Sequence, residues 1–442
     1  MTRHCPLCPN KSGNPVLGHG PKTARVMCIA EQPGKDEVKH GLPMVGKTGK
    51  EYDGQYLPLA GLHRREVYTT NVVKCMIAET GRAPGEKLVE SCKEFHLARE
   101  IAEIEPEVIV LMGGVACRAF LSDLDLETHH GFPVTLDMGG YKPTVFPTFH
   151  PALGIHKGSA MTHLRDDFKD LKKLLEGTLD TPHDEFPQPL YKVLSEADFH
   201  IPILDVAAVD TEFDSKTGNP WCLTYSSMPA TGYMIRSDSK MALTRFSNRL
   251  LGVSKVILHN AMADLPVLER MGVTIPQSKI EDTMFMSYHL GKYPQSLKRL
   301  AFRLCGMEMQ DYSDLVRPYS VDQALDYLIR CSYETWERPE PEVVEQLDGT
   351  FKLYQAQSVG TKIKRLMTDM AKNPNIHPLD RWENWSEEER MMVEDRMGPM
   401  PRASISQVPF EKALTYSCRD ADATLRVWHK LKQLKREIRR AV

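Results

Sequence analysis

The sequence predicts an α/β protein of two domains joined by a linker, and three observations support this fold class. In the first half, four apolar runs alternate with helical patterns, which is typical of a parallel sheet covered by helices. In the second half, an apolar strand is followed by strand-to-helix segments and by a long amphipathic helix. Between the halves, residues 175–193 are rich in proline and acidic residues and lack an apolar period, as linkers do.

The first half is expected to form an α/β/α sandwich with its functional groups at the carboxyl ends of the strands. Its four strands are predicted in "VMCIAEQPGKDEVKHGLPMVGKTGK", "VYTTNVVKC", "EPEVIVLMGGVACRAFL" and "PTVFPTFHPALGI". The first run leads into a loop rich in glycine and proline, and the last ends in His-Pro. Glycine loops alone are weak signals of function, so the order of these motifs matters more than any one of them.

The second half carries acidic residues in three separate patterns. The run "VAAVDTEFD" ends in Asp210 and Glu212, which strand alternation places on one face. In "KVILHNAMADLPVLERMG" a strand turns into a helix, with Asn260 at the turn and Asp264 one helical turn later. Taken alone, each acid is more simply a surface charge or a helix cap, because acidic side chains are mostly exposed.

The third pattern lies on the long helix "FEKALTYSCRDADATLRVWHKLKQLK", where Tyr416 and Asp420 are four residues apart and share a face. Hard divalent cations bind clustered carboxylate oxygens, and two such ions can clamp both oxygens of a phosphoryl displacement. Tyr416 would then orient the attacking water or help to deprotonate it. The ordered set D-x-E, N-x3-D and Y-x3-D therefore predicts phosphodiester hydrolysis.

Size and charge leave room for such a protein and exclude some others. The chain has 442 residues, 41% of them hydrophobic, and a formal net charge of -3, so two or three cored domains are expected. The low basicity argues against a protein that coats nucleic acid without specificity, although a local basic stripe can still contact phosphates. Without an apolar run of membrane-spanning length or a secretory signal, we expect a protein of the bacterial or phage-infected host cytoplasm.

The ten cysteines of the chain are not expected to form disulfides in that compartment. Four of them stand out, because a C-x2-C pair, a strand end and a helix start supply them in order: Cys5, Cys8, Cys75 and Cys92. Four converging thiolates suit either Zn²⁺ or an iron–sulfur cluster, and their spacing alone does not choose between the two.

From about residue 190 to 442 the chain resembles the proofreading 3′→5′ exonuclease domain of family A DNA polymerases, in the tyrosine branch of the DEDD superfamily. The three acidic patterns carry the resemblance, together with "IEDTMFMSYHL" and "SLKRLAFRLCG". It implies a ribonuclease H-like α/β fold that acts on the 3′ ends of DNA. It also implies two Mg²⁺ or Mn²⁺ ions on Asp210, Glu212, Asp264 and Asp420, water placed by Tyr416, and substrate contact by Asn260.

Residues 1–178 resemble a family 4 uracil-DNA glycosylase. The four cysteines in order, the loop "AEQPG…DE…GLPMVG", the strand "TNVVKC" and the "HPA" motif agree in order and spacing. The resemblance implies a structural [4Fe–4S] cluster on Cys5, Cys8, Cys75 and Cys92, and uracil-containing DNA as the partner. It also implies extrusion of deoxyuridine from the base stack before the N-glycosidic bond is hydrolysed.

The same resemblance assigns roles within the glycosylase pocket. His150 would stabilise the departing uracil anion, and Asn71 would read the uracil edge with its amide. Glu31 and Glu37 are alternative candidates for placing the water. The pocket wall is expected from Gln32, Pro33, Gly34 and Met44.

Two departures from the family pattern bear on the activity. Met44 stands where the family has an aromatic residue that stacks on uracil, and the loop reads Ala-Glu-Gln-Pro-Gly where the family has Gly-Glu-Ala-Pro-Gly. Gln32 is found in members that trap DNA covalently, but residues 76–90 lack the histidine those members use. Ordinary hydrolysis, or a damaged site, is therefore favoured over covalent trapping.

Three hypotheses follow. The leading one is a bifunctional enzyme that excises uracil and removes 3′ nucleotides. In the second, the glycosylase-like half is an inactive DNA-binding module that serves the exonuclease or recruits a separate DNA polymerase. In the third, the N-terminal cysteines bind zinc within an interaction domain.

The expected domains are residues 1–178 and residues 193–442, with residues 179–192 as the linker. A stretch rich in charge, methionine and tryptophan, residues 333–409, interrupts the exonuclease pattern and is given no chemistry. Its Trp382 and Trp385 are expected to pack in a core, because burial is the usual state of an aromatic ring.

Overall fold

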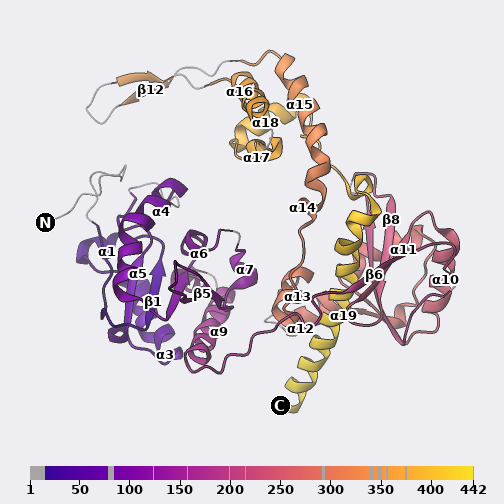
Figure 1. Cartoon of the computed structure of the whole chain (residues 1–442), viewed down its shortest axis with the longest axis horizontal. Helices are drawn as coiled ribbons and strands as arrows, with labels where there is room; N and C mark the ends of the chain where they lie inside the picture. Colours follow the sequence, from indigo (N-terminus) through magenta and orange to yellow (C-terminus); the bar gives the residue numbers. More distant parts are fainter. Residues whose placement is uncertain are drawn as a thin grey trace. The chain divides into compact units, whose positions relative to one another are not determined.

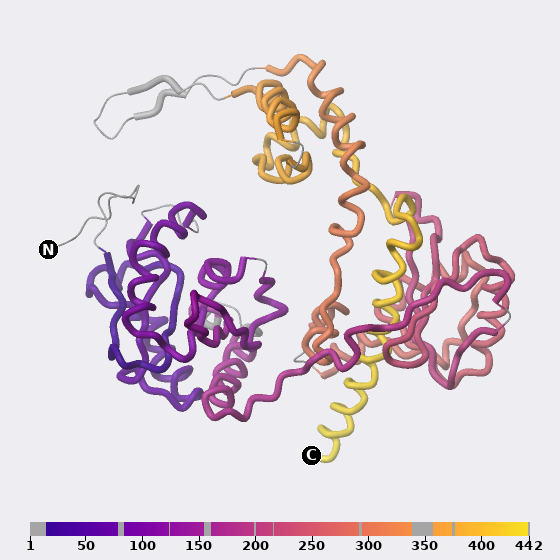
Figure 2. Tube along the Cα trace, viewed as in Figure 1, coloured from indigo at the N-terminus to yellow at the C-terminus, as the bar shows by residue number. Residues whose placement is uncertain are grey.

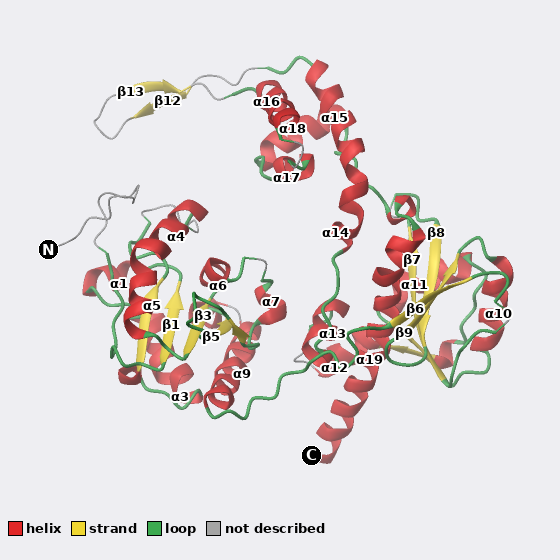
Figure 3. Cartoon of the chain, viewed as in Figure 1, coloured by secondary structure: helices red, strands yellow, loops and turns green. Residues whose placement is uncertain are grey.

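The computed structural model describes residues 15–77, 84–122, 124–156, 158–198, 200–214, 216–290, 294–337, 342–345, 351–354, 357–373 and 376–441 (Figures 1 and 2). The chain divides into two compact units, the first made mainly of residues 1–183 and the second mainly of residues 184–442. Each unit is an α/β domain with its own sheet, as the sequence predicts (Figure 3). None of the helices in these ranges combines the length and the apolar character needed to cross a lipid bilayer.

The first unit has a five-stranded sheet in the order β2-β1-β3-β5-β4. Four strands run parallel, namely β1 (Val26–Ala30), β2 (Val67–Asn71), β3 (Val108–Met112) and β5 (Thr144–Thr148), and β4 (Val134–Thr135) pairs antiparallel with β5. The helices are α1 (Lys35–His40), α2 (Gly46–Glu51), α3 (Leu57–Leu59), α4 (Glu86–Cys92), α5 (Ala98–Ile104), α6 (Gly114–Phe120), α7 (Leu126–His129), α8 (Pro151–His156) and α9 (Gly158–Leu175). Single π-helical turns lie at Tyr52–Tyr56 and Lys93–Leu97, and a 3-10 turn lies at Arg64–Glu66.

Both faces of this sheet are buried, which makes the unit a sandwich. Along β1, Cys28 belongs to the core cluster on one face, while Met27 and Ile29 belong to the cluster on the other. This alternation explains why all five residues of β1 are apolar. Because the four main strands are parallel, their carboxyl ends lie along one edge of the sheet.

The second unit has a six-stranded sheet in the order β11-β10-β7-β8-β9-β6. The strands are β6 (Leu190–Leu194), β7 (Val206–Phe213), β8 (Pro220–Ser226), β9 (Thr231–Arg236), β10 (Lys255–Leu258) and β11 (Ile280–Asp282). β7, β8 and β9 form an antiparallel meander, whereas β10 and β11 run parallel to β7. β6 starts inside the stretch that the sequence predicts as linker and pairs with β9.

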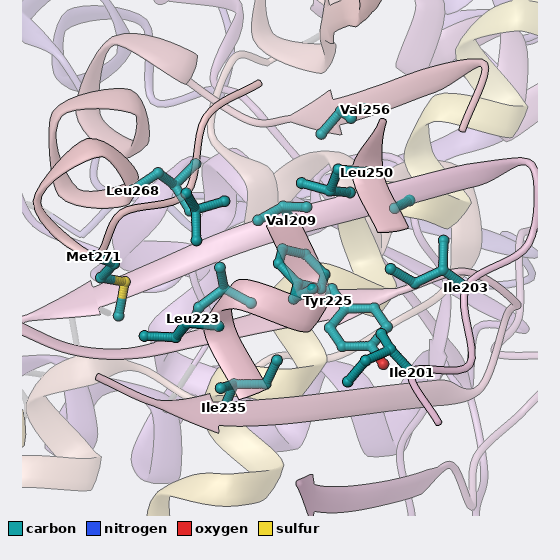
Figure 4. Packing of buried hydrophobic residues seen from close by; sticks show 14 of the residues in the cluster. Ile201, Ile203, Val209, Leu223, Tyr225, Ile235, Leu250, Val256, Leu268 and Met271 are labelled. Carbon is teal, nitrogen blue, oxygen red and sulfur yellow. The ribbon is translucent and has the colours of Figure 1, made fainter. Parts of the chain in front are cut away.

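Helices cover both faces of this second sheet. α10 (Lys240–Leu250) and α11 (Ala261–Arg270) pack on one face, over the cluster of Val209, Tyr225 and Leu268 shown in Figure 4. The long helix α19 (Phe410–Ala441) packs on the other face, where Leu425 meets Ala208. Two more helices, α12 (Thr283–Leu290) and α13 (Leu297–Cys305), follow β11 in sequence, and a short turn lies at Gln277–Lys279.

α19 is fixed to the unit by a buried ionic cluster. The Asp422 carboxylate accepts hydrogen bonds from Arg426 on the next turn, at 2.9 and 2.7 Å, and from the Ala230 backbone N–H. Asp184 pairs with Arg426 at 2.7 Å and with Arg419 at 2.9 Å. Asp184 lies within the predicted linker. Part of that segment is therefore bound to α19, the helix that carries Tyr416 and Asp420.

In the stretch that interrupts the exonuclease pattern, residues 333–409, three described helices pack together. α16 (Val359–Lys372), α17 (Pro378–Glu383) and α18 (Glu387–Met397) share a core with α15 (Val321–Tyr333), so the packing begins before residue 333. Trp382 is 2% exposed in that core, with the Trp385 ring 5.2 Å away, as predicted for packing residues. The remaining elements are α14 (Tyr312–Val316), the hairpin of β12 (Glu342–Glu345) and β13 (Phe351–Tyr354), and turns at Arg317–Ser320 and Ile405–Gln407.

Candidate active sites

Three carboxylates of the second unit lie close together on the α19 face of the sheet. Ala208, whose face of β7 meets α19, is followed by Asp210 and Glu212 at alternate positions, so both acids point toward that helix. α19 presents Asp420 from its own side, and one ligand oxygen from each of the three lies within 4.8 Å of the others. Residues 210 and 420 are more than two hundred positions apart, so only the fold brings them together.

Asp264 approaches from the opposite side of β7. It lies in the first turn of α11 and is 5% exposed. Its Oδ1 accepts hydrogen bonds from the Thr211 backbone N–H at 3.1 Å and from the Thr211 hydroxyl at 2.7 Å. The structure thus places Asp264 beside the three clustered acids, near enough for its charge to raise the pKa of Asp210, but outside the group whose oxygens converge.

The acidic cluster is electrostatically unfavourable without a cation. Burial, and then the charges of the neighbouring acids, hold the pKa of Asp210 well above its usual range. Burial followed by the charge of Asp420 raises the pKa of Glu212 to about 8, and burial raises those of Asp264 and Asp420 to about 7. Within the described part of the chain, Glu212 Oε1 is also buried without a hydrogen-bond partner. A buried, unpartnered oxygen among like charges is what a divalent cation would satisfy.

These pKa shifts predict how stability depends on pH in the metal-free protein. Between about pH 4, where unfolded carboxyls titrate, and about pH 8, the folded state keeps protons that the unfolded chain has lost. The free energy of unfolding of the second unit should therefore fall as the pH rises through this window. Thermal unfolding in EDTA from about pH 5 to about pH 8 measures it, and added Mg²⁺ should flatten the slope. A slope of the opposite sign would contradict the electrostatic description.

Tyr416 stands one helical turn before Asp420 and is 8% exposed. The Tyr312 ring meets its ring at a centroid distance of 6.3 Å. The Tyr312 hydroxyl accepts the Ile405 backbone N–H at 3.1 Å, which anchors this neighbour in turn. Burial and the charges of Asp420 and Glu212 raise the pKa of Tyr416, so its hydroxyl stays protonated and can donate a hydrogen bond.

Asn260 occupies the sharp turn between β10 and α11. Its backbone is left-handed, with φ 66° and ψ 59°, a conformation that asparagine tolerates better than most residues. Asp282, at the end of the neighbouring strand β11, accepts the backbone N–H groups of Asn260 and Ala261 at 3.1 and 2.8 Å. Asp282 therefore fixes the turn that precedes Asp264, a role that sequence reasoning missed because "IED" predicts only a strand.

Sequence reasoning also missed a cation beside the acidic cluster. Lys298, at the start of α13, places its Nζ 5.6 Å from the centroid of the Tyr416 ring. Its charge lowers the pKa values of Asp420 and Glu212 against the stronger effect of burial. The available signal was its position in "SLKRLAFRLCG", one of the segments that carry the resemblance to the exonuclease family.

In the first unit, the candidate residues gather at the carboxyl edge of the parallel sheet. Asn71 ends β2, Glu31 follows β1, and His150 comes two residues after β5. Between them, β3 is followed directly by Gly113, whose φ of 96° few other residues adopt. A Cβ at Gly113 would lie 3.2 Å from the His150 Cβ, so glycine lets the two neighbouring strand ends approach.

The Asn71 side chain is 1% exposed, and neither its Nδ2 nor its Oδ1 has a hydrogen-bond partner among the residues that the structure describes. Leaving a buried amide unpaired costs about 1–3 kcal/mol for each polar group. Such a group at the edge where ligands bind in open α/β sheets indicates a partner that both donates and accepts.

His150 is held as a neutral imidazole. Burial lowers its pKa to about 4. Its Nδ1 accepts the backbone N–H of Ala152 at 3.2 Å, so the proton of the neutral ring resides on Nε2. The ring can therefore donate a hydrogen bond from Nε2 without carrying a charge.

The two glutamates near the loop have different environments. Glu37 is buried and accepts the backbone N–H groups of Gly34, at 2.5 Å, and Met44, so its two oxygens hold the loop closed around α1. Glu31 is only partly buried, and its Oε1 accepts the Gln32 amide at 3.3 Å. Burial raises the pKa of Glu31, with Gln32 and Arg118 acting in the opposite direction.

Met44 is part of the core rather than of an open wall. It is 4% exposed and packs in the cluster that includes Tyr52 and Phe168. Its backbone has φ 51°, and its carbonyl oxygen would lie 2.1 Å from a Cβ at Gly49, so this turn requires glycine at position 49. Gln32 accepts the Ile77 backbone N–H at 3.1 Å, and Pro33 is buried, so these loop residues are also held in place.

Two of the four predicted cluster ligands lie within the described residues. Cys75 is partly buried and Cys92 is buried at the end of α4. Lys74, next to Cys75, is close enough to Cys92 for the thiol's charge to raise the lysine pKa, although burial lowers that pKa overall. Cys5 and Cys8 lie outside the described residues.

The buried Lys74 links this region to Asn71. Its Nζ contacts the Asn71 carbonyl oxygen and Glu100 Oε2, each at 2.7 Å, and the Thr70 hydroxyl at 2.6 Å. The side chains of Lys74 and Glu100 are 0% and 12% exposed. A fully buried ammonium thus supports the strand end that presents the amide of Asn71.

Comparison with known proteins agrees with these two sites. Residues 17–172 match the family model of the uracil DNA glycosylase superfamily, and residues 190–330 match that of a 3′-5′ exonuclease. The type-4 uracil-DNA glycosylase of Saccharolobus solfataricus is 33% identical over 167 residues, which are 37% of this chain and 76% of that protein. The Thermotoga maritima type-4 enzyme is 37% identical over 150 residues, 34% of this chain and 74% of that protein.

Other matches cover smaller shares. A DNA polymerase of Bacillus phage SP01 is 26% identical over 163 residues, which are 37% of this chain and 17% of the polymerase. The catalytic core of RRP6 from Trypanosoma brucei matches with a TM-score of 0.30 and 14% identity, over 59% of this chain and 51% of that one. Brucella melitensis NrnC matches with a TM-score of 0.22 and 18% identity, over 28% of this chain and 65% of that one. The chain thus spans about half to two thirds of these solved structures.

In the first unit, the family match over residues 17–172, the type-4 relatives and the site at the strand ends agree. The second unit carries the acidic site and its own family match. The chain therefore belongs to the type-4 uracil-DNA glycosylases through its N-terminal domain and carries a 3′-5′ exonuclease domain after it.

Proposed function

We propose that the chain is a bifunctional DNA enzyme that hydrolyses the N-glycosidic bond of deoxyuridine and removes nucleotides from 3′ ends. The observation that supports the first activity best is the buried Asn71 amide with both polar atoms unpaired. The convergence of Asp210, Glu212 and Asp420 supports the second. Residues 1–178 would supply the glycosylase, residues 193–442 the exonuclease and residues 179–192 the linker, in a bacterial or phage-infected host cytoplasm.

In the glycosylase site, Asn71 would recognise the flipped base. Uracil presents an N3–H donor beside its O4 acceptor, which matches an amide that accepts at Oδ1 and donates from Nδ2. As the bond between C1′ and N1 breaks, negative charge develops on the uracil ring. Neutral His150 would donate from Nε2 to the O2 atom and stabilise this anion. A neutral imidazole suits this role. At pH 7 it still carries its Nε2 proton and can share that proton with the anion in a hydrogen bond.

Glu31 is the better candidate to place the water, because both oxygens of Glu37 already bind loop backbone. The water oxygen would form the new bond to C1′, and the Glu31 carboxylate would accept its proton. The expelled uracil anion is then protonated on release. Gln32, Pro33 and Gly34 would hold the loop that carries Glu31, and Met44 would support it from the core.

In the exonuclease site, Asp210, Glu212, Asp264 and Asp420 would hold two Mg²⁺ or Mn²⁺ ions, which the buried, unpaired Glu212 oxygen fits. Such ions stabilise charge on the attacking and leaving oxygens of a phosphoryl transfer. The chain's own contribution is orientation. Protonated Tyr416 would donate a hydrogen bond to the attacking water and so orient its lone pair. Asn260, at the turn before Asp264, would position the DNA strand.

A [4Fe–4S] cluster on Cys5, Cys8, Cys75 and Cys92 is consistent with the two described cysteines, since a cation beside Cys92 favours a thiolate. The cluster would hold the strand end and α4 together and take no part in bond cleavage. Brown protein with visible absorbance would distinguish it from zinc.

The test is a uracil-release assay of the full chain in EDTA, on a single-stranded oligonucleotide with one deoxyuridine. Hydrolysis of the N-glycosidic bond needs no divalent ion, so abasic sites should form in EDTA while the exonuclease is inactive. Restoring Mg²⁺ should start shortening from the 3′ end on an oligonucleotide without uracil. If wild-type protein forms no abasic sites under these conditions, the glycosylase assignment is wrong.

Asn71→Ala and His150→Ala should each lower uracil release by about 10²-fold or more, because each removes a hydrogen bond to the departing base. A Glu37→Gln variant is expected to affect stability more than rate. Equal loss of rate in all three variants would indicate general unfolding, which the melting temperature would show.

One observation supports a second candidate function. Met44 fills the place of a stacking aromatic residue yet lies in the core, so the pocket has lost a surface on which uracil would rest. In that case the first domain would bind DNA without cleaving it and would deliver the exonuclease to its substrate or to a separate polymerase. Binding of a uracil oligonucleotide without release of uracil would favour this reading.

A further inference from the structure

Lys298 lies at the edge of the acidic site without being able to bind a metal ion. It is the second residue of α13, and its side chain is 30% exposed. Its Nζ stands 5.6 Å from the centre of the Tyr416 ring, and Tyr416 and Asp420 share one face of α19. An ammonium repels divalent cations, so its presence here needs another explanation.

The ion pair that Lys298 makes does not supply this explanation. Its Nζ lies 2.9 Å from Asp311 Oδ1, but the Asp311 side chain is 69% exposed, and exposed pairs contribute little to stability. Asp311 is also the residue before α14, where a carboxylate is common without any lysine partner. The pair therefore holds the ammonium loosely, beside a site that a polyanion must enter.

A hydrolysed phosphodiester gains negative charge on its non-bridging oxygens as water attacks. The water would be oriented by the Tyr416 hydroxyl, and Lys298 covers the ring of that same residue. The ammonium has a flexible four-carbon stem and three donors, so it can turn from Asp311 to a phosphate oxygen without moving α13.

We propose that Lys298 leaves Asp311 when DNA enters and binds a non-bridging oxygen of the phosphodiester that is cleaved. This inference rests on the proposed exonuclease function of the second domain and adds a substrate contact to it. Lys298 is then a catalytic residue supplied by α13, in addition to those on β7, α11 and α19.

The test compares Lys298→Met, which keeps the length of the side chain and removes its charge, with the wild-type full chain. With Mg²⁺ and a 3′-labelled single strand, kcat/KM should fall on the order of 10²-fold. With Ca²⁺, under which cleavage is expected to be suppressed, binding of the same strand should weaken, and the slope of log K against log salt should decrease by about 0.7. Lys298→Arg should recover most of both.

Two controls separate this role from a structural one. Lys192→Met removes a lysine of the same kind, paired with Asp198 at 2.8 Å on β6, and should change neither quantity. Asp311→Asn frees the ammonium and should leave kcat/KM equal or higher. The affinity for Mn²⁺, titrated without DNA, should stay equal or rise in Lys298→Met, because a repelling charge is removed.

The binding measurement keeps the two proposals distinguishable. If the wild-type chain degrades no DNA, the exonuclease assignment fails, yet the salt slope in Ca²⁺ still reports whether Lys298 contacts a phosphate. An unchanged slope and an unchanged kcat/KM in Lys298→Met would overturn the inference. A lowered Mn²⁺ affinity with an unchanged salt slope would overturn it as well, by showing a structural role.

Discussion

Asp210→Asn is expected to abolish 3′→5′ degradation, by at least about 10³-fold, while uracil release in EDTA stays at the wild-type level. The substitution keeps the shape of the side chain and removes one of the three converging carboxylates, so that charge is lost at the centre of the group. Time courses on a 3′-labelled single strand with Mg²⁺ measure the first activity, and abasic-site formation measures the second.

The same variant should be more stable than the wild type when no metal is present. Three neighbouring acids raise the pKa of Asp210, more than act on any other carboxylate of the cluster. Removing its charge therefore relieves repulsion in the folded state. Its unfolding transition in EDTA at about pH 8 should move to higher temperature. Asp238→Asn, which alters an exposed aspartate paired with Arg236, is the matched control and should change neither activity nor stability. Degradation that persists in Asp210→Asn would show that the metal site is wrongly assigned.

Lys74→Met is expected to destabilise the glycosylase domain by about 3–5 kcal/mol, because it leaves Glu100 largely buried without its cation. The Asn71 carbonyl and the Thr70 hydroxyl lose their contacts with the ammonium as well. Denaturant unfolding of the full chain, followed through the first transition, measures the loss, with the visible absorbance recorded to report on the cluster.

The double variant Lys74→Met/Glu100→Gln should recover a large part of this stability, because the unpaired charge is gone. Recovery distinguishes a buried ion pair from a general packing defect. Lys22→Met breaks an ion pair of the same domain whose side chains are 68% and 55% exposed, and should cost little. If the double variant is no more stable than Lys74→Met, the ion pair does not explain the effect.

Much of the fold follows from local pattern. Strand β7 and helix α19 were predicted because an apolar run and a 3.6-residue period are strong signals, and the parallel strands of the first sheet are apolar because both faces are covered. The strand β6 was missed, since it is short, begins among prolines and has an exposed first residue. The strands β12 and β13, of four residues each, were not predicted, because segments so short carry little periodicity.

The candidate sites show the same division between local and distant information. The alternation of Asp210 and Glu212 fixes their common face from the sequence alone. The side from which Asp264 approaches could not be predicted, because it depends on which face of β7 receives α11. Likewise, nothing local separates Glu31 from Glu37. Their difference arises from the backbone N–H groups of Gly34 and Met44, which the folded loop turns toward Glu37.

The ion pairs of Asp184 with Arg419 and Arg426 affect where the exonuclease half can be cut from the rest of the chain. The family match and the first strand both begin at residue 190, which makes that position the obvious place to start a shortened gene. A polypeptide that begins at residue 190 would lack Asp184, so Arg419 and Arg426 on α19 would each lose an ion pair. Starting it a few residues upstream of position 184 keeps that anchor, because the compact unit begins at Asp184, ahead of the region of sequence similarity.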